Sequence, residues 1–438
     1  MRVGILGGGL TALTIANGLK AECEVLEKEP ECGGLCRSTL EKGFTFDQGG
    51  HILYSKDTET LNWMLEQLGG NKAKKRRNNR VFVKGRKIKY PFENDLAHLP
   101  LMENWFCLYN YLFNPYKKKP KNFKEWIYHT FGRGIAEVYL VPYNEKIWNF
   151  PPEHMSLHWV DGRVPKPPKI DVIKSSIGIP TEGYKHQLYF FYPKHEGIQA
   201  LIKALEEDVK FKCNFEVKSI EKLGSKWFVS DGKRKKGYDQ LISTIPIQEL
   251  LKALPKVPPK VKKAVNDLRF NSLITVMIGI NRPKLNDMTA LYIPTRDVAF
   301  HRVCFMNNFS EYAAPQGKFG IIAEITVNKG DGIFELSDEE VIEKVVDGLH
   351  KLKIIDKDDV VFSKAVRAEY AYVVYNLDYL ENIKIVRGYI ESLGIILCGR
   401  FAEFEYLNMD ACVKRALELA KRLNNGEKSD SKKEKKVN

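Results

Sequence analysis

Long hydrophobic runs are missing from this sequence of 438 residues. No apolar stretch approaches the roughly 18 to 20 residues that a membrane-spanning helix requires. The few apolar residues after Arg2 are interrupted by a glycine turn, and no small-residue cleavage site follows them, which argues against a secretory signal. We therefore expect a cytoplasmic protein with no transmembrane segment.

Paired cysteine spacings are also missing. The eight cysteines are scattered, and Cys32 and Cys36, with three residues between them, match no familiar zinc or redox spacing. We predict no metal site and expect free thiols, as in a reducing compartment.

Acidic residues are too few to balance the basic ones, and the formal net charge is +14. Much of the excess lies in three runs, at 72–77, 117–121 and 432–436. These runs lack interleaved aromatic residues and fit no nucleic-acid-binding signature, so we expect no nucleic acid partner. A solvated surface is the first interpretation, and attraction of an anionic substrate or of an acidic membrane face is the alternative.

The length of the chain exceeds what one compact core usually holds and predicts two domains, which could be interleaved. With 44% hydrophobic and 11% aromatic residues, the chain can bury a large core.

The most informative stretch runs from Arg2 to Asp47. Its pattern predicts a strand over 3–6, a turn at Gly7-Gly8-Gly9, a helix over 11–20 and a strand over 24–26 that ends in Glu27. Glycines let the backbone approach a diphosphate, free N–H groups at the helix start hold its charge, and the acid accepts hydrogen bonds from a ribose. Taken alone the turn is weak evidence, because such turns also occur without a ligand.

Two further pieces follow in order. Gly33-Gly34 stands close to Arg37 and supplies a second anion-binding turn, and residues 44–51 read Phe-Thr-Phe-Asp-Gln-Gly-Gly-His. The ordered set resembles the FAD-binding opening of the superfamily of amine oxidases, protoporphyrinogen oxidases and UDP-galactopyranose mutases. The resemblance implies a flavoprotein with FAD as its cofactor.

The remaining pattern predicts a helix over 57–68, a hairpin over 80–91, strands over 211–220, 271–280 and 319–327, and a helix over 337–352 that begins with a capping pattern. Together with the resemblance, we expect an α/β fold: a discontinuous Rossmann-type FAD-binding domain (1–70, 190–250 and 390–423), an inserted helical domain (99–165) and an antiparallel-sheet substrate domain (80–98 and 260–389). From residue 424 to 438 we expect a disordered tail, because the segment is polar and lysine-rich.

A second resemblance, to UDP-galactopyranose mutase, covers nearly the whole chain. It is carried by a set of short motifs in the expected order: Gly49-Gly50-His51-Ile52, Tyr90-Pro91-Phe92-Glu93-Asn94, Tyr143 with Trp148, Gly162-Arg163, His301-Arg302, Tyr372, and Gly399-Arg400 with Tyr406-Leu407-Asn408-Met409-Asp410. The segment from Gly399 to Asp410 is the most specific of them.

The resemblance implies three groups of site residues. The catalytic group is His51, Arg163, Arg302 and Arg400. The cofactor-binding group is Gly7, Gly9, Leu10, Thr11, Glu27, Lys28, Gly34, Leu35, Gly50, His51, Val217, Gly399, Arg400, Asn408 and Met409. The substrate-binding group is Asn94, Tyr143, Trp148, Arg163, Arg302, Tyr372 and Tyr406.

Residue chemistry alone leaves two of these assignments open. A lone tryptophan such as Trp148 is usually core, although its face could stack on a nucleotide sugar. The histidine beside Arg302 is either surface polarity or part of a site. Two residues also depart from the mutase pattern: Tyr54 stands where a second histidine is expected, and Asn408 replaces an aspartate.

The mutase resemblance implies conversion of UDP-galactopyranose to UDP-galactofuranose, a ring contraction without net redox change that serves cell-surface polysaccharide biosynthesis. Reduced flavin N5 would attack the anomeric carbon while UDP leaves, and arginines with tyrosines would hold the departing diphosphate. The expected partners are a UDP-sugar, an external reductant and a homo-oligomer. The alternatives are an FAD-dependent oxidoreductase of the amine oxidase or protoporphyrinogen oxidase type, and a flavin-binding protein without turnover whose basic surface docks an anionic partner.

Overall fold

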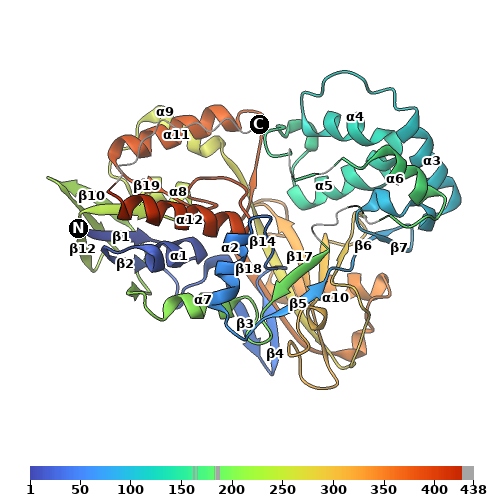
Figure 1. The fold of residues 1–438 in the computed structure, drawn as a ribbon, viewed down its shortest axis with the longest axis horizontal. Helices are drawn as coiled ribbons and strands as arrows, with labels where there is room; N and C mark the ends of the chain where they lie inside the picture. Colours follow the sequence, from blue (N-terminus) through green and yellow to red (C-terminus); the bar gives the residue numbers. More distant parts are fainter. Residues whose placement is uncertain (161–162, 165, 182, 184–187, 427–438) are drawn as a thin grey trace.

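The computed structural model describes residues 1–160, 163–164, 166–181, 183 and 188–426 (Figure 1). Gly162 of the predicted Gly-Arg motif and residues 427–438 of the predicted tail lie outside the described residues. Within the described ranges, no helix combines the length and the hydrophobicity needed to cross a bilayer.

A five-stranded parallel sheet lies at one end of the molecule, with the strand order β19-β13-β1-β2-β9 (Figure 1). Its central strand β1 (Arg2–Leu6) pairs with β2 (Glu22–Leu26) and β13 (Gln240–Ser243), and β9 (Phe211–Lys212) and β19 (Ile396–Leu397) form the edges. The apolar residues of β1 are buried on both faces, as a parallel sheet covered by helices requires. The sheet is therefore assembled from segments that are far apart in the sequence.

Two helices pack side by side on this sheet, α1 (Leu10–Gly18) and α12 (Met409–Asn424). A Cβ atom on Gly18 would lie 2.8 Å from the Cβ atom of Ala420, so the glycine permits the close approach. The other elements of this end are α2 (Thr58–Gln67), α7 (Gln199–Glu206), α8 (Ile247–Ala253), α9 (Pro259–Asp267), α11 (Tyr379–Leu393), and a small sheet of β10 (Ser219–Leu223), β11 (Lys226–Ser230) and β12 (Lys235–Tyr238).

The expected single strand over 211–220 is wrong. The chain leaves the sheet after Lys212 and enters β10 only at Ser219. Between them Asn214 has a φ of +52° and its N–H donates to the Glu29 carbonyl, so the backbone turns away from an extended path.

A seven-stranded sheet forms the middle of the molecule, in the order β18-β14-β17-β16-β15-β6-β7. Its strands are β6 (Asn79–Val83), β7 (Arg86–Lys89), β14 (Arg269–Ile280), β15 (Ala290–Tyr292), β16 (Arg302–Phe305), β17 (Phe319–Val327) and β18 (Val360–Val374). All neighbours are antiparallel except β6 and β15. The predicted hairpin and the predicted strands over 271–280 and 319–327 are confirmed. Helix α10 (Asp338–Lys351) packs beside the sheet, and Ser337 and Glu340 form its predicted capping box.

A helical region projects at the opposite end from the parallel sheet (Figure 1). It contains α3 (Leu101–Leu112), α4 (Phe123–Ile135), α5 (Val141–Trp148) and α6 (Lys169–Ser176). Glycine lets α3 and α4 touch, because a Cβ atom on Gly134 would lie 2.5 Å from Cα of Cys107. Two ribbons, β3 (Ser38–Glu41) with β4 (Phe44–Asp47) and β5 (Ala73–Arg76) with β8 (Tyr189–Tyr192), join the three regions. The structure thus has the predicted α/β fold with helices and an antiparallel-rich sheet.

Candidate flavin and nucleotide-sugar site

The first glycine turn leaves backbone exposed where β1 meets α1. Gly7 has a φ of +91°, which favours glycine, and a Cβ atom added to Gly9 would meet no atom within 4 Å. Helix α1 begins at Leu10 without a side-chain cap, and Gly9 is its N-cap. The N–H groups of the first helical turn can therefore bind an anion that approaches over Gly9.

Glu27 lies at the end of β2 and turns back toward this glycine turn. Its carboxylate accepts hydrogen bonds from the N–H of Gly8 at 2.6 Å and of Glu29 at 2.9 Å. Its backbone carbonyl accepts the N–H of Phe215, so the segment that leads to half-buried Val217 lies beside it. Lys28 is exposed and pairs with Glu29.

The second glycine turn touches the first. The N–H of Gly33 donates to the Gly8 carbonyl at 2.8 Å, and a Cβ atom on Gly34 would lie 3.5 Å from Cα of Gly9. Leu35 follows in the same short helical turn and is half-buried. The two turns expected to bind a dinucleotide are therefore adjacent in space.

A third glycine approaches the start of α1 from the carboxyl end of the chain. Gly399 has a φ of +103°, and a Cβ atom there would lie 2.8 Å from Oγ1 of Thr11. The N–H of Gly399 donates to Glu403 at 2.7 Å. The same segment runs on to Asn408 and Met409 at the start of α12, which packs beside α1. These glycine and helix-start features leave room for an extended dinucleotide such as FAD and supply N–H donors for its phosphates.

Three aromatic rings from distant segments contact one another and form what we call the aromatic cluster: Trp148, Tyr372 and Tyr406. The distance between ring centroids is 6.0 Å for Trp148 and Tyr372, 5.5 Å for Trp148 and Tyr406, and 5.8 Å for the two tyrosines. The indole N–H of Trp148 donates to Asn144. The cluster joins the end of α5, strand β18 and the loop before α12.

Two arginines stack on this cluster. The guanidinium carbons of Arg163 and Arg400 each lie 4.5 Å from the ring centroid of Tyr406, and Arg400 also lies 5.4 Å from that of Tyr372. Arg163 donates to the backbone carbonyl of Tyr406. Two positive charges on tyrosine rings make this site suited to an anionic ligand.

Arg400 is held by the backbone and keeps one nitrogen available. It donates to the carbonyls of Leu407 at 2.9 Å and Ala371 at 2.5 Å. Its buried Nε atom has no hydrogen-bond partner among the described residues. A buried donor without an acceptor is costly, so a ligand oxygen at this position would satisfy it.

A buried acid, Glu324 on β17, organises the neighbouring part of the site. Its carboxylate accepts Nε and Nη2 of Arg302, each at 2.8 Å, and the N–H of Gly50 at 2.7 Å. Nε2 of His301 lies 3.5 Å from the same carboxylate. Arg302, predicted to bind substrate, is thus ion-paired within the protein.

Electrostatics keep these groups in defined protonation states. Burial would raise the pKa of Glu324, but Arg302 and the nearby His301 outweigh it and lower the pKa to about 2. Burial lowers the pKa of His51 to about 4; Glu324 opposes this shift, and Arg302 and Arg400 add to it. His51 is therefore neutral at pH 7, and its buried Nδ1 has no partner among the described residues.

Two predicted substrate residues lie apart from the direct contacts of the aromatic cluster. Tyr143 is buried on α5 and packs at 5.5 Å against Tyr292, and burial raises its pKa well above the usual value. Asn94 is buried as well, and its amide donates to Oγ1 of Thr181 at 2.6 Å.

The sequence-based prediction does not include Glu324, although the sequence carries a signal for it. It interrupts a run of apolar residues in a strand that is buried throughout, and a charged residue there is rarely unpaired.

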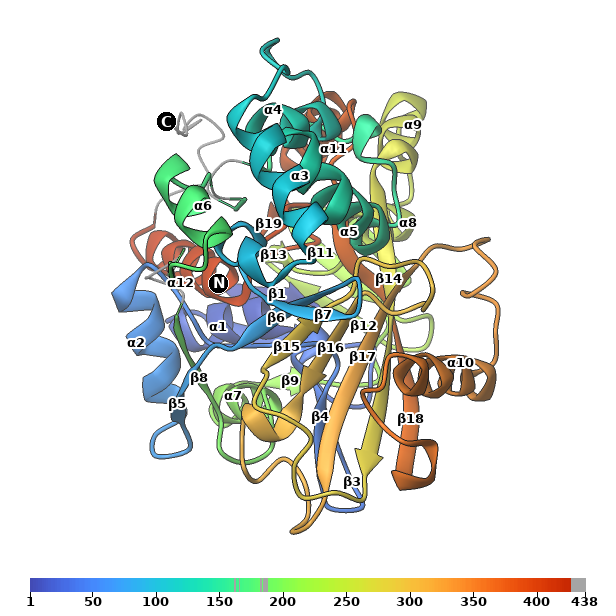
Figure 2. The same ribbon diagram turned by 90° about the vertical axis from the view of Figure 1, so that its right-hand side faces the viewer.

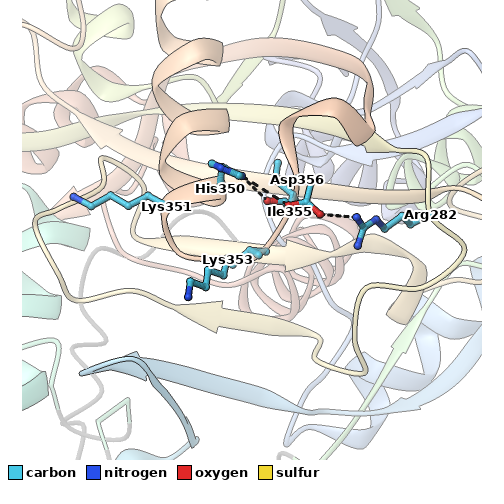
Figure 3. A pocket seen from close by; sticks show the side chains of 7 residues that line it. Arg282, His350, Lys351, Lys353, Ile355 and Asp356 are labelled. Atoms are coloured by element: carbon cyan, nitrogen blue, oxygen red, sulfur yellow. Dashed lines mark hydrogen bonds and ion pairs between the residues drawn. The ribbon is translucent and has the colours of Figure 1, made fainter.

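The surface also has two hollows. One, of about 580 Å³, is lined by residues at the end of α10 and in the loop after it, together with Arg282. Figure 3 shows that Asp356 bonds Arg282 and lies near His350, while the Lys351 and Lys353 side chains point away. The other, of about 510 Å³, lies between β5, β6 and β7 and includes Arg76, Arg77 and Arg80. Neither contains a residue of the aromatic cluster.

Comparisons with known proteins give the site its context. Residues 5–68 match the model of an NAD(P)-binding Rossmann-like domain, and residues 173–380 match that of flavin-containing amine oxidoreductases.

Solved structures with the same architecture include enzymes of two kinds. A crystal structure of reduced UDP-galactopyranose mutase has a TM-score of 0.88 and 25% sequence identity, covering 97% of this chain and 95% of that chain. A protein from Exiguobacterium sp. 255-15, provisionally described as a protoporphyrinogen oxidase, has a TM-score of 0.76 and 18% identity over 97% and 99% of the chains. Putrescine oxidase bound to putrescine has a TM-score of 0.64 and 16% identity over 97% and 99%. The chain is a flavoprotein of the superfamily that includes UDP-galactopyranose mutases and flavin-containing amine oxidoreductases, with FAD as its cofactor.

Proposed function

We propose that this flavoprotein is a UDP-sugar pyranose/furanose mutase, of the type that interconverts UDP-galactopyranose and UDP-galactofuranose. The observation that carries the proposal is the aromatic cluster with Arg163 and Arg400 stacked on it. A site for an amine or an apolar substrate has no use for two arginines, whereas a nucleotide-sugar diphosphate is an anion that needs them.

We assign the backbone turns to the cofactor. Gly7, Gly9, Leu10 and Thr11 would hold the FAD diphosphate at the start of α1, with Glu27, Lys28 and Val217 toward the adenosine end. The residues assigned nearer the flavin ring are Gly34, Leu35, Gly50, His51, Gly399, Arg400, Asn408 and Met409. When bound in its reduced state, the flavin supplies the nucleophile for the anomeric carbon.

The side chains do the remaining work. Arg163 and Arg400 neutralise the diphosphate as negative charge builds on the leaving UDP, and Tyr372 and Tyr406 donate hydrogen bonds to its oxygens. Burial raises the pKa of Tyr372, so its hydroxyl keeps the proton that it donates. Trp148 is only 3% exposed and packs on both tyrosines, so in this proposal it acts by holding their rings in place. Tyr143 and Asn94 are buried too, and we retain them as predicted substrate-binding residues.

His51 and Arg302 affect the electrostatics of the site but donate no hydrogen bond to UDP in this proposal. Neutral His51 can accept or donate one hydrogen bond beside the flavin without adding positive charge. The positive charge of Arg302 acts on the ligand only in part, because Glu324 neutralises it.

The reaction also requires an external reductant, which keeps the flavin in its reduced state. We place the chain in the cytoplasm, because all eight cysteines are free thiols, and we retain the homo-oligomer as a prediction.

The test is turnover of UDP-galactofuranose. Protein reduced with dithionite should convert it to UDP-galactopyranose, and the oxidised protein should not. Free FAD reduced by dithionite is the matched control. Absence of product with UDP-hexoses under reduction would reject the mutase.

The second candidate is an oxidoreductase, which the amine oxidoreductase match over 173–380 favours. In that case product would form in proportion to the electron acceptor consumed. Measuring oxygen or dye consumption beside product formation separates the two functions.

A further inference from the structure

Helix α3 carries an apolar face that the rest of the chain leaves uncovered. Its most exposed members are Leu101, Met102, Trp105, Tyr109, Leu112 and Phe113, with exposed fractions from 40% to 77%. Their spacing places them on one side of the helix, while Cys107 and Tyr111 on the other side are buried. Tyr116, three residues beyond Phe113, is 40% exposed and is counted with this face, although its ring also packs on Tyr128 of α4.

The face continues onto the neighbouring helix α6. The amide of Asn104 on α3 donates to the Ser176 carbonyl at 2.8 Å, which holds the two helices together. Ile170, Ile177 and Ile179 are exposed at α6 and its end. Ten of the nineteen large hydrophobic side chains that are exposed in the described part of the chain lie in this α3–α6 face, so it is a patch and not scattered exposure.

The patch lies at the end of the molecule that is remote from the FAD-binding sheet. Figure 1 places α3 at the right-hand edge, and Figure 2, which looks onto that edge, shows α3 and α6 facing the viewer. A flat surface can therefore approach the patch without meeting the parallel sheet.

Basic residues stand at both ends of the α3 face. Lys117, Lys118, Lys119 and Lys121 are exposed just after its carboxyl end, and the stretch 112–121 contains no acidic residue. Lys84, Arg86 and Lys87 are exposed in the β6–β7 hairpin near its other end. Lys84 lies 3.8 Å from Glu103, and Arg86 donates to the His98 carbonyl.

The basic residues at both ends of the face favour an anionic bilayer over a second copy of the chain as its binding partner. In a twofold dimer the face would meet its own copy, and because both ends are basic, either orientation would bring like charges together. An anionic bilayer has the complementary charge, and tryptophan, tyrosine and leucine with flanking lysines are the composition of helices that lie in a membrane interface.

We propose that the α3–α6 face is a docking surface for an anionic lipid bilayer, which holds the protein peripherally by insertion of the α3 side chains and by the flanking lysines. The inference does not depend on the proposed mutase activity.

The experiment is co-sedimentation of the full chain, loaded with FAD, with vesicles of phosphatidylglycerol and phosphatidylcholine or of phosphatidylcholine alone. Binding should be strong on the anionic vesicles, weak on the neutral ones, and reduced by about 0.5 M salt, which shortens the Debye length to a few ångströms. Equal or absent binding on both vesicles would overturn the proposal.

Matched variants separate the apolar and the charge contributions. The double variant Trp105→Ser with Phe113→Ser should lower vesicle affinity at least about tenfold, and the pair Leu223→Ser with Tyr312→Ser, exposed elsewhere, should leave it unchanged. Lys117→Gln, Lys118→Gln and Lys119→Gln together should lower the affinity for anionic vesicles at least about tenfold. The exposed α9 lysines 260, 262 and 263, changed in the same way, should not.

The visible absorbance of bound FAD shows that each variant is folded. A dimer in analytical ultracentrifugation that the Trp105/Phe113 variant dissociates would assign the face to a second copy and reject the bilayer. Vesicle binding by that variant equal to that of the wild type would also reject the bilayer.

Discussion

The two halves of the candidate site are built from different parts of the chain and by different means. The cofactor end is made of backbone: glycine turns at 7–9 and 33–34 and the start of α1, all within one short stretch. The substrate end is made of side chains, with Trp148, Arg163, Tyr372 and Arg400 brought together from positions far apart in sequence. Backbone sites impose glycine at fixed spacings and can be recognised from sequence, whereas side-chain sites depend on the whole fold.

The largest expected effect is at Gly399, where the two halves touch. In Gly399→Val, the positive φ alone would cost about 1–2 kcal/mol. The new side chain would also press on Thr11, from which even a Cβ atom would be only 2.8 Å away. We expect purified protein with little bound FAD, measured as the ratio of flavin to protein absorbance.

The control for this change is Gly388→Ala in the interior of α11, where a Cβ atom meets nothing within 4 Å. It should keep its flavin and gain slightly in helix stability. Full flavin content in Gly399→Val would show that the cofactor end does not need this close approach.

The next effect concerns the buried pair beneath the site. Glu324→Gln would leave the Arg302 charge, whose side chain is only 20% exposed, without its partner, and we expect a loss of about 3 kcal/mol in the free energy of unfolding. Urea denaturation measures it. Glu311→Gln, at an exposed carboxylate, is the control.

Adding Arg302→Gln to Glu324→Gln removes the unpaired charge and should restore part of the stability. If the single and the double variants were equally unstable, the loss would come from packing and not from charge.

A smaller and more selective effect is expected for Arg163→Ala. Loss of a charge-assisted contact to phosphate should weaken UDP binding by about 1.5–3 kcal/mol, while the flavin stays bound because Arg163 touches the substrate end only. Calorimetric titration of UDP into the variant tests this. The control is Arg282→Ala, which removes an exposed ion pair with Asp356 in the hollow at the end of α10 and should bind UDP as the wild type does. Loss of the flavin in Arg163→Ala would show that the two ends are not separable.

The last effect, confined to a limited pH range, is expected at His51. The imidazole has a pKa of about 4 in the folded chain and about 6.5 when unfolded, so the unfolded state binds more protons between these values. Stability of the flavin-free protein should therefore fall as the pH drops from 6.5 to 4. In His51→Gln the midpoint of thermal unfolding should fall less over this window.

The difference between the two pH profiles isolates His51. Asp47, whose pKa burial raises to about 6, contributes with the opposite sign, but it is present in both proteins. Parallel profiles would contradict the buried neutral state of the imidazole.

The same contrast explains what the sequence could predict. Hydrophobic periodicity and capping residues located β14, β17, the β6–β7 hairpin and α10, because these elements have local signals. The prediction of one strand over 211–220 is wrong because Asn214 adopts a left-handed backbone conformation, which asparagine permits but does not require. The aromatic cluster had no local signal, and only family resemblance suggested its members. Glu324 was predictable in principle from its place in an apolar strand.

The central claim is that the flavin serves an isomerisation and not a net oxidation, and turnovers per reduced flavin test it most directly. The protein is reduced anaerobically with one equivalent of dithionite per flavin, freed of excess reductant, and given UDP-galactofuranose, and product and flavin absorbance are recorded together. We predict many molecules of UDP-galactopyranose per flavin while the flavin stays reduced. Product that never exceeds one molecule per flavin, or that appears only as the flavin changes oxidation state, would contradict the claim.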